Sequence, residues 1–346
     1  FDRFCRTVVE RRRVPHSTYL AVTGACPFAC GHCSYAGRSD KTMTTDEMLA
    51  TIAQVKGLGT ATLGLTGGEP LLRDDLEALI AAAVPEMACI VFTTGHGLDA
   101  RRAERLGAAG VTCVTIGLEY ADAVEHDRVR GRCGSFAEAE AAAEACRAAG
   151  VYLAISTVST REKLASGELD RLYSLGERWG AGEFRVLAPV ATGAWTGCGS
   201  VMLSAEERRA LADFHSRHNR HDAGPAVASF AYLESDALFG CGAGFHHLYI
   251  DAGGQVCPCD LTPLSLGDVT AERLSDIWKR MGALFPVPRR GCLMGELAAD
   301  LRDHAGPLPL SPEVSARLCG AHPARGPLPE GYRRLVKAGE GFMDPG

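Results

Sequence analysis

The spacing of hydrophobic positions alternates in a regular way between residues 16 and 187. Short apolar runs rich in β-branched residues, typical of buried strands, alternate with segments in which apolar residues recur every three or four positions, typical of amphipathic helices. Strands are predicted at 16–23, 61–65, 89–92, 111–118, 151–158 and 183–187. Helices are predicted between them, at 44–55, 74–83, 99–109, 136–149 and 169–179.

The regular alternation predicts an α/β fold. Strand–helix–strand units form a parallel sheet with right-handed crossovers, and glycines stand at most helix ends, at 57, 110, 150 and 180. Six strands suit a partial (βα)6 barrel similar to a TIM barrel, and functional residues are expected at the carboxyl ends of its strands. The open side of such a barrel is expected to admit something larger than a metabolite.

The regular alternation of predicted strands and helices ends after Pro189. A helix is predicted at 204–219, where Ser204 and Glu207 form a capping box, and a hairpin at 248–257. Further helices are predicted at 1–13, 271–281 and 312–318. The domain prediction is a barrel at 1–225, including an N-terminal helix at 1–15, and a small cysteine-rich domain with a tail at 226–346.

Composition narrows the function classes. The formal charge of −6 argues against a nucleic-acid surface or an anionic membrane, and no run approaches 18 apolar residues. Fourteen cysteines without a secretory signal favour metal ligation in a reducing compartment over a disulfide framework. The protein is therefore expected to be cytoplasmic.

The loop that follows the first predicted strand carries Cys26, Cys30 and Cys33 in a C-x3-C-x2-C pattern. A cubane iron–sulfur cluster normally takes four cysteines, so three imply one iron that is open to other chemistry. The alternatives are a zinc knuckle, which usually shows paired C-x2-C motifs, or three unrelated core cysteines.

This loop, together with Gly-Gly-Glu-Pro at 67–70 after the second strand, resembles the radical SAM (S-adenosylmethionine) superfamily. Residues 116–119 and 126–136 match further stretches of that family. The resemblance implies that Cys26, Cys30 and Cys33 hold a 4Fe–4S cluster whose fourth iron binds S-adenosylmethionine. Such enzymes cleave this cosubstrate reductively to a 5′-deoxyadenosyl radical, which takes a hydrogen atom from the substrate.

The resemblance also implies cofactor-binding roles. His32 would hold adenine; the alternative is that it is a surface residue. Approach to the methionyl amino group is implied for Gly67, Gly68, Glu69 and Pro70. The alternatives are that the two glycines form an ordinary turn and that Glu69 has a structural role. Gly117 stands where the family often has serine. The remaining candidates for the ribose and carboxylate are Glu119, Arg130 and Ser156, and Arg185 would bind the carboxylate or the substrate, or form a structural ion pair.

A second cysteine group brackets the predicted hairpin. Cys241 and Cys259, separated by 17 residues, resemble the SPASM or twitch extension of radical SAM enzymes. The resemblance implies one auxiliary 4Fe–4S cluster that transfers electrons, with Cys292 as a third ligand. Cys257 or Cys319 would be the fourth: an extended strand turns Cys257 away from Cys259, whereas a bend at Pro258 turns both inward. Buried cysteines or a zinc site are the alternative.

These features lead to one functional hypothesis, a radical SAM oxidoreductase acting on a natural-product, cofactor-precursor or ribosomal-peptide substrate. Its expected partners are that small molecule or peptide and an electron donor such as flavodoxin or ferredoxin. About 16 residues precede the first strand, so no leader-peptide-binding domain is expected there. The alternatives are a non-catalytic iron–sulfur carrier or scaffold and a zinc-stabilised binding module.

Overall fold

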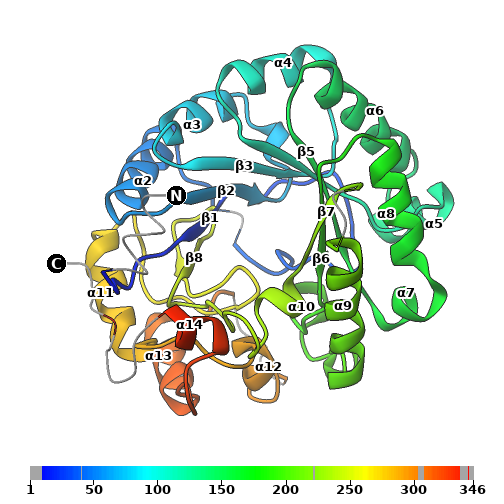
Figure 1. Ribbon diagram of the computed structural model, residues 1–346. Coiled ribbons are helices and arrows are strands. Elements are labelled where there is room, and N and C mark those ends of the chain that lie inside the picture. Colours follow the sequence, from blue (N-terminus) through cyan, green and yellow to red (C-terminus); the bar gives the residue numbers. More distant parts are fainter. Residues whose placement is uncertain (1–9, 40, 221–222, 303–307, 336–341, 343–346) are drawn as a thin grey trace.

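A computed structural model describes residues 10–39, 41–220, 223–302, 308–335 and 342. A curved sheet forms its centre, with helices packed along the outer face (Figure 1). Residues 1–9 of the predicted N-terminal helix lie outside the described residues, and residues 10–13 are not helical.

The sheet has nine strands in the order β7-β6-β5-β4-β3-β2-β1-β8-β9. Neighbouring strands run parallel, apart from the antiparallel β8–β9 hairpin. The bounds are β1 Ser17–Thr23, β2 Thr62–Gly67, β3 Ala88–Thr93, β4 Cys113–Gly117, β5 Leu153–Val158, β6 Glu183–Leu187, β7 Ala226–Ser229, β8 His247–Ile250 and β9 Val256–Cys257.

The connecting helices follow the predicted pattern, with additions. The bounds are α2 Thr45–Gly57, α3 Leu76–Ala83, α4 Ala100–Ala108, α5 Ala123–Arg130, α6 Ser135–Ala148, α7 Arg161–Ser166, α8 Glu168–Arg178, α9 Ala205–His218, α10 Phe230–Leu233, α11 Leu274–Leu284, α12 Leu293–Leu297, α13 Pro312–Ala321 and α14 Glu330–Leu335. Short 3-10 turns are η1 Pro70–Leu72, η2 Gly193–Trp195 and η3 Gly199–Val201. The capping box predicted at Ser204 and Glu207 is present, and a second one at Thr44 and Glu47 starts α2.

The core lies between the strands and these helices. Leu20 of β1 pairs with Leu65 of β2 on one side and Ile250 of β8 on the other, and all three are fully buried. Ile52 of α2 packs in the same cluster. Burial of each such side chain stabilises the fold by about 1.5–3 kcal/mol, so the sheet is a rigid support for the loops at its edges.

The chain after residue 225 departs from the simple barrel prediction. The predicted hairpin forms, but β8 pairs in parallel with β1, so it extends the barrel sheet. β7 was not predicted, because its short sequence Ala-Val-Ala-Ser lacks a strand pattern and its structure depends on pairing with β6. The domain boundary at 225 therefore stays a prediction.

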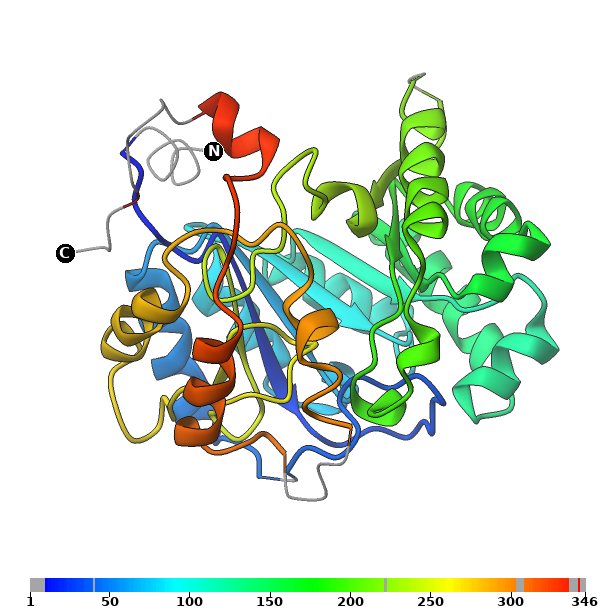
Figure 2. The same cartoon turned by 90° about the horizontal axis from the view of Figure 1, so that it is seen from below.

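The segments that follow β7 lie together on one side of the molecule. The hairpin, α11, α12 and α13 lie away from α5–α8, as Figure 1 shows, and Figure 2 shows the same separation from below. Among the described residues, no helix combines the length and apolar character needed to cross a bilayer.

Candidate functional site

The cysteine loop begins where β1 meets the end of β2. Gly68 N donates to Thr23 O (2.8 Å) and Glu69 N donates to Ala25 O (2.9 Å). A Cβ atom on Gly67 or Gly68 would overlap the carbonyl oxygens of Thr23 or Ala25. The two glycines therefore let β2 pack directly on the start of the loop.

Glu69 braces the neighbouring strand ends. Its carboxylate is fully buried and accepts hydrogen bonds from Leu71 N (3.0 Å), Thr93 Oγ1 (2.7 Å) and Thr94 N (2.8 Å). Pro70 begins η1 beside it. These contacts match the structural role that the sequence left open for Glu69, and a role for Glu69 or Pro70 in binding the cosubstrate stays a prediction.

Two further segments form backbone hydrogen bonds with the rest of the cysteine loop. Ala29 N donates to Arg130 O (3.1 Å) at the end of α5, and Gly31 N donates to Val129 O (3.3 Å). On the opposite side, Ala194 N of η2 donates to Cys33 O (2.9 Å). Three separate elements thus fix the loop that carries the three thiols.

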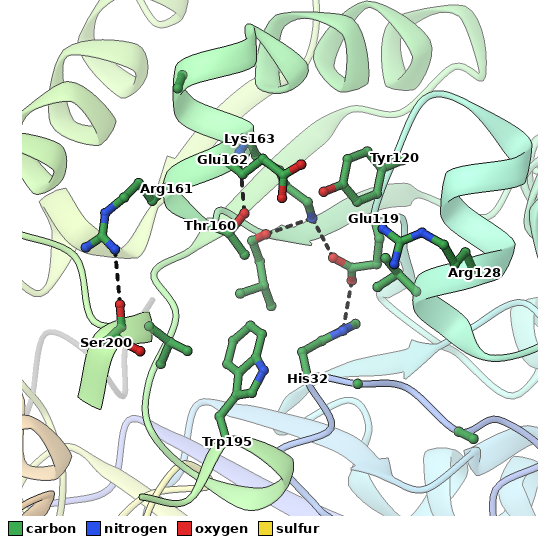
Figure 3. A pocket seen from close by; sticks show the side chains of 16 residues that line it. His32, Glu119, Tyr120, Arg128, Thr160, Arg161, Glu162, Lys163, Trp195 and Ser200 are labelled. Carbon is green, nitrogen blue, oxygen red and sulfur yellow. Dashed lines mark hydrogen bonds and ion pairs between the residues drawn. The ribbon is translucent and has the colours of Figure 1, made fainter. Parts of the chain in front are cut away.

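Glu119 is the buried centre of a network of polar and charged side chains, and Figure 3 shows its contacts with His32 and Lys163. Glu119 Oε1 lies 3.3 Å from Arg130 Nη2 and 3.2 Å from His32 Nε2, while its Oε2 accepts from Lys163 Nζ at 2.6 Å. Burial alone would raise the pKa of Glu119, but the contacts with His32, Lys163 and Arg130 hold it well below its usual value. Arg130 Nη1 also donates to Cys30 Sγ (3.7 Å), so the network reaches a predicted cluster ligand.

Lys163 was not identified from the sequence. Its ammonium group, on α7, also donates to Thr157 Oγ1 (3.0 Å) and Val158 O (2.8 Å), and its side chain is 2% exposed. No motif marks a single lysine on a short helix, so only the tertiary structure reveals this contact with Glu119.

A cavity of about 750 Å³ opens beside this network. His32 and Trp195 line it with ring centroids 5.9 Å apart, and Tyr120 and Glu119 form another part of its wall (Figure 3). An aromatic pair with adjacent polar atoms suits a flat heterocycle such as adenine. Trp195 was missed because it lies after the predicted barrel motifs, in an irregular segment.

The thiols of the loop fit a cluster better than a single metal ion. Cys26, Cys30 and Cys33 interact electrostatically, yet their sulfur atoms do not all lie within 4.8 Å of one another. A tetrahedral zinc ion needs all its sulfur ligands around one centre, whereas a cubane cluster distributes them over several irons. Burial raises the pKa of Cys26 to about 11, so cluster binding must displace protons.

Arg130 offers a second test of fit. Its side chain is 9% exposed, and its Nε atom is buried with no hydrogen-bond partner among the described residues. A buried donor of this kind is costly unless a ligand satisfies it. The site beside Cys30 therefore fits an anionic group such as a carboxylate.

A larger cavity, of about 1220 Å³, occupies the barrel interior. Tyr19, Phe92, Ser156 and Arg185 line its barrel side. Ser156 thus faces inward, as the alternation along β5 predicts for one of the two hydroxyl residues, while Thr157 contacts Lys163. The far wall includes three of the five predicted auxiliary ligands, namely Cys241, Cys259 and Cys292.

Arg185 is ion-paired within this cavity. Its Nε donates to Glu183 Oε1 (2.8 Å) and its Nη2 to Glu183 Oε2 (3.1 Å), and its guanidinium lies over the ring of Phe92 at 5.5 Å. The predicted ion pair is therefore present, and the guanidinium also faces the barrel interior.

The other two predicted auxiliary ligands lie elsewhere. Cys257 is fully buried in a small cluster with Tyr249 and accepts a hydrogen bond from Arg38 Nη1 (3.6 Å). Cys319 is buried on α13 in the main core, near Arg289. Neither lines the cavity that Cys241, Cys259 and Cys292 share, so the structure groups three thiols where four were expected.

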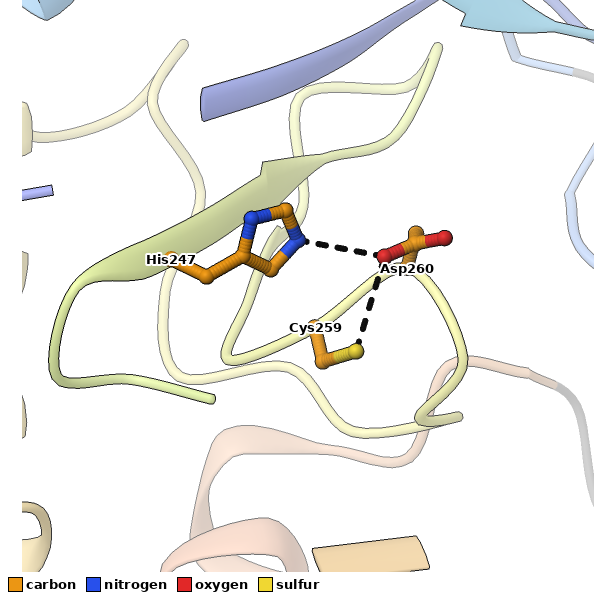
Figure 4. A group of neighbouring side chains, drawn as sticks. All are labelled: His247, Cys259 and Asp260. Atoms are coloured by element: carbon orange, nitrogen blue, oxygen red, sulfur yellow. Dashed lines mark hydrogen bonds and ion pairs between the residues drawn. The ribbon is translucent and has the colours of Figure 1, made fainter. Parts of the chain in front are cut away.

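Polar side chains line the same cavity as these three thiols. His247 Nε2 lies 3.1 Å from Asp260 Oδ1, which also accepts from Cys259 Sγ at 3.5 Å (Figure 4). Glu234, at the end of α10, is exposed to the cavity, and desolvation raises its pKa to about 7. None of these three polar residues was singled out from the sequence.

Comparisons with known proteins agree with this geometry. Residues 20–161 match the model of the radical SAM superfamily, and residues 241–284 match the model of the SPASM iron–sulfur cluster-binding domain. Radical SAM proteins use a 4Fe–4S cluster with S-adenosylmethionine, and SPASM domains bind auxiliary iron–sulfur clusters.

Individual relatives cover most of the chain. An AdoMet-dependent heme synthase of Nitratidesulfovibrio vulgaris is 28% identical over 285 residues, covering 75% of this chain and 77% of that protein. The mycofactocin maturase MftC of Mycobacterium ulcerans is 33% identical over 278 residues, covering 75% of this chain and 73% of its own length.

Solved structures share the fold. Streptococcus suis SuiB, in a crystal structure bound to S-adenosylmethionine, has a TM-score of 0.65 at 17% identity, over 83% of this chain and 72% of that chain. The cysteine loop on a parallel sheet, the second cysteine group and the two matched models lead to one conclusion: this chain is an enzyme of the radical SAM superfamily with a C-terminal SPASM domain.

Proposed function

We propose that this enzyme cleaves S-adenosylmethionine reductively at a cluster held by Cys26, Cys30 and Cys33, and abstracts a hydrogen atom from a natural-product, cofactor-precursor or peptide substrate. The observation that carries the proposal is the 1220 Å³ cavity, whose lining runs from inward-facing residues of the barrel strands to Cys241, Cys259 and Cys292. One space thus adjoins both the barrel interior and the proposed auxiliary centre.

A 4Fe–4S cluster held by Cys26, Cys30 and Cys33 would supply the one-electron reduction that cleaves S-adenosylmethionine to methionine and a 5′-deoxyadenosyl radical. The protein's own residues bind and orient that cosubstrate. Arg130, with its unpartnered Nε, would hold the methionyl carboxylate, and His32 with Trp195 would hold adenine. Both oxygens of Glu119 are engaged by cations, so it positions Arg130 and His32, while Ser156 remains a candidate for the ribose.

The cavity wall would hold the substrate and exclude water. Tyr19 and Phe92 present aromatic surface with ring centroids 5.0 Å apart, and Arg185 adds a fixed positive charge beside Phe92. Rigid, largely apolar walls limit side reactions of a radical with solvent. The volume accommodates a drug-sized molecule or a short peptide segment.

Cys241, Cys259 and Cys292 would hold the auxiliary 4Fe–4S cluster. Their position on the cavity wall lets that centre accept an electron from the substrate side, and an external donor such as flavodoxin or ferredoxin would reduce the first cluster. The heme synthase and the maturase named above are the relatives whose substrate types are candidates here.

Deuterium transfer tests the proposal. The reconstituted enzyme is incubated anaerobically with S-adenosylmethionine, dithionite and, in turn, peptides or metabolites specified by neighbouring genes, deuterated at non-exchanging carbons. The expected result is 5′-deoxyadenosine that carries deuterium from one candidate, detected by mass spectrometry. If abundant 5′-deoxyadenosine forms and a candidate is converted to product without any deuterium transfer, hydrogen abstraction is excluded.

A further inference from the structure

The auxiliary centre has three thiols on the cavity wall, although a cubane cluster has four irons. This inference rests on the proposed function, in which Cys241, Cys259 and Cys292 hold that cluster. Cys257 and Cys319 are committed to other surroundings, next to Arg38 and Arg289 respectively. Three thiols leave the fourth iron open to another ligand, and a protein donor would come from the cavity that the three thiols share.

Four carboxylates line that cavity, and three of them have partners. Asp236 is paired with Arg290 and Glu296 with Arg289. Asp260 accepts from His247 and from the thiol of its neighbour Cys259 (Figure 4). Each of these three carboxylates therefore already has a protein partner.

Glu234 is the fourth. Its carboxylate has no hydrogen bond or ion pair among the described residues. It is exposed to the cavity that Cys241, Cys259 and Cys292 also line, and its charge raises the pKa of each of these three thiols. Its position directly after α10 brings it to the cavity from a segment separate from the cysteines.

We propose that Glu234 is the fourth protein ligand of the auxiliary cluster, which gives a three-cysteine, one-glutamate site. A carboxylate oxygen is a harder donor than a thiolate and binds iron–sulfur centres less firmly. The iron bound by Glu234 would be chemically distinct from the other three and would be the one that mild oxidation removes.

The experiment isolates this centre. The background protein carries Cys26→Ala, Cys30→Ala and Cys33→Ala, so that only the auxiliary cluster is loaded. In this background, the variants Glu234→Cys, Glu234→Gln and Glu234→Ala are each compared with the protein that retains Glu234. Asp236→Asn is the matched control for an ion-paired acid of the same cavity, and Asp260→Asn tests the rival ligand. The readouts are iron per chain, Mössbauer spectra, and the 3Fe–4S signal in electron paramagnetic resonance after ferricyanide oxidation.

The background protein is expected to show one distinct iron site in four and ready conversion to a 3Fe–4S form. Glu234→Cys should make the four irons equivalent and reduce that conversion at least fivefold, whereas Glu234→Gln and Glu234→Ala should increase it. Asp236→Asn should match the background. Unchanged spectra in all Glu234 variants, or the same changes in Asp260→Asn instead, would overturn the proposal.

Failure of this ligand assignment is distinguishable from failure of the proposed function. With Cys26, Cys30 and Cys33 intact, 5′-deoxyadenosine formation is measured separately in the Glu234 variants. Spectra that exclude Glu234 while this product still forms reject the ligand alone. Loss of all iron from the background protein would reject the three cysteines as a cluster site, and the glutamate with them.

Discussion

The guanidinium of Arg130 lies against the backbone of Gly117, and a Cβ atom at position 117 would overlap its Nη2 atom. This placement lets Arg130 bridge Glu119 (3.3 Å) and Cys30 (3.7 Å). The sequence showed a glycine where related enzymes often have serine. The structure gives the physical reason: at this strand end, the arginine occupies the space of the missing side chain.

A side chain at position 117 is therefore expected to weaken cosubstrate binding. Gly117→Ala should displace Arg130 and raise the Kd for S-adenosylmethionine by about tenfold or more, since a charge-assisted contact is worth at least about 1.4 kcal/mol. Anaerobic equilibrium dialysis of the reconstituted protein measures the Kd for S-adenosylmethionine. Gly57→Ala is the control, because a Cβ there meets nothing within 4 Å. An unchanged Kd in Gly117→Ala would show that Arg130 does not bind the cosubstrate.

Removal of Lys163 should destabilise the protein. Lys163→Met leaves the buried Glu119 with Arg130 and His32 only, and loss of one partner from a buried ion pair costs about 3–5 kcal/mol. Chemical denaturation measures the free energy of unfolding. Lys56→Met, which removes an ion pair with Glu86 on the surface of α2, should cost less than about 1 kcal/mol. Equal losses in both variants would contradict the buried network.

The barrel and the cysteine loop were predictable because their signals are local. Apolar runs such as 151–158 specify strands, and three thiols within eight residues specify a ligand loop. Lys163, Trp195 and Glu234 were not predictable, because each gains its role from residues far away in the sequence.

The choice between Cys257 and Cys319 as the fourth ligand stays a prediction, although neither residue lines the cavity that the other three cysteines share. Spacing does not tell which way a thiol points, and in the structure Arg38 and Tyr249 surround Cys257 while α13 buries Cys319 in the core. β7 likewise owes its structure to pairing with β6. Long-range contacts, which leave no local pattern, decide all of these features.

Iron content distinguishes ligands from core cysteines. Cys292→Ser should lower the iron of the reconstituted protein by about four atoms per chain, because a whole cubane cluster is lost. Cys257→Ser and Cys319→Ser should retain it, since neither residue lines the shared cavity. Colorimetric iron and sulfide assays on gel-filtered protein provide the measurement. Loss of iron in Cys257→Ser or Cys319→Ser would return that residue to the ligand set.

Three buried histidines are expected to weaken the fold as the pH falls from about 6.5 toward 4. Burial lowers the pKa of His126 to about 4, and its Nδ1 accepts from Glu119 N (3.1 Å). Burial also lowers the pKa of His16 to about 4 and that of His246 to about 3. Unfolding raises each pKa to about 6.5, so the unfolded chain binds more protons between pH 6.5 and 4 and stability falls as the pH decreases through this range.

His126→Gln tests this linkage. Urea denaturation at several pH values between 7 and 4.5 should show a shallower loss of stability in the variant, by up to about 1.4 kcal/mol per pH unit, the effect of one proton. Parallel curves for the variant and the unmodified protein would mean that His126 already titrates normally in the folded state.

Cosubstrate cleavage tests the central claim most directly. The reconstituted enzyme is incubated anaerobically with S-adenosylmethionine and dithionite, and 5′-deoxyadenosine is quantified by chromatography for the unmodified protein and for Cys26→Ala, Cys30→Ala, Cys33→Ala and Cys133→Ala. The unmodified protein and Cys133→Ala, whose exposed thiol lies outside the loop, should form the product, and each of the three loop variants should form none. Product from any loop variant at the level of the unmodified protein would contradict the assignment of these three thiols to the cluster that cleaves S-adenosylmethionine.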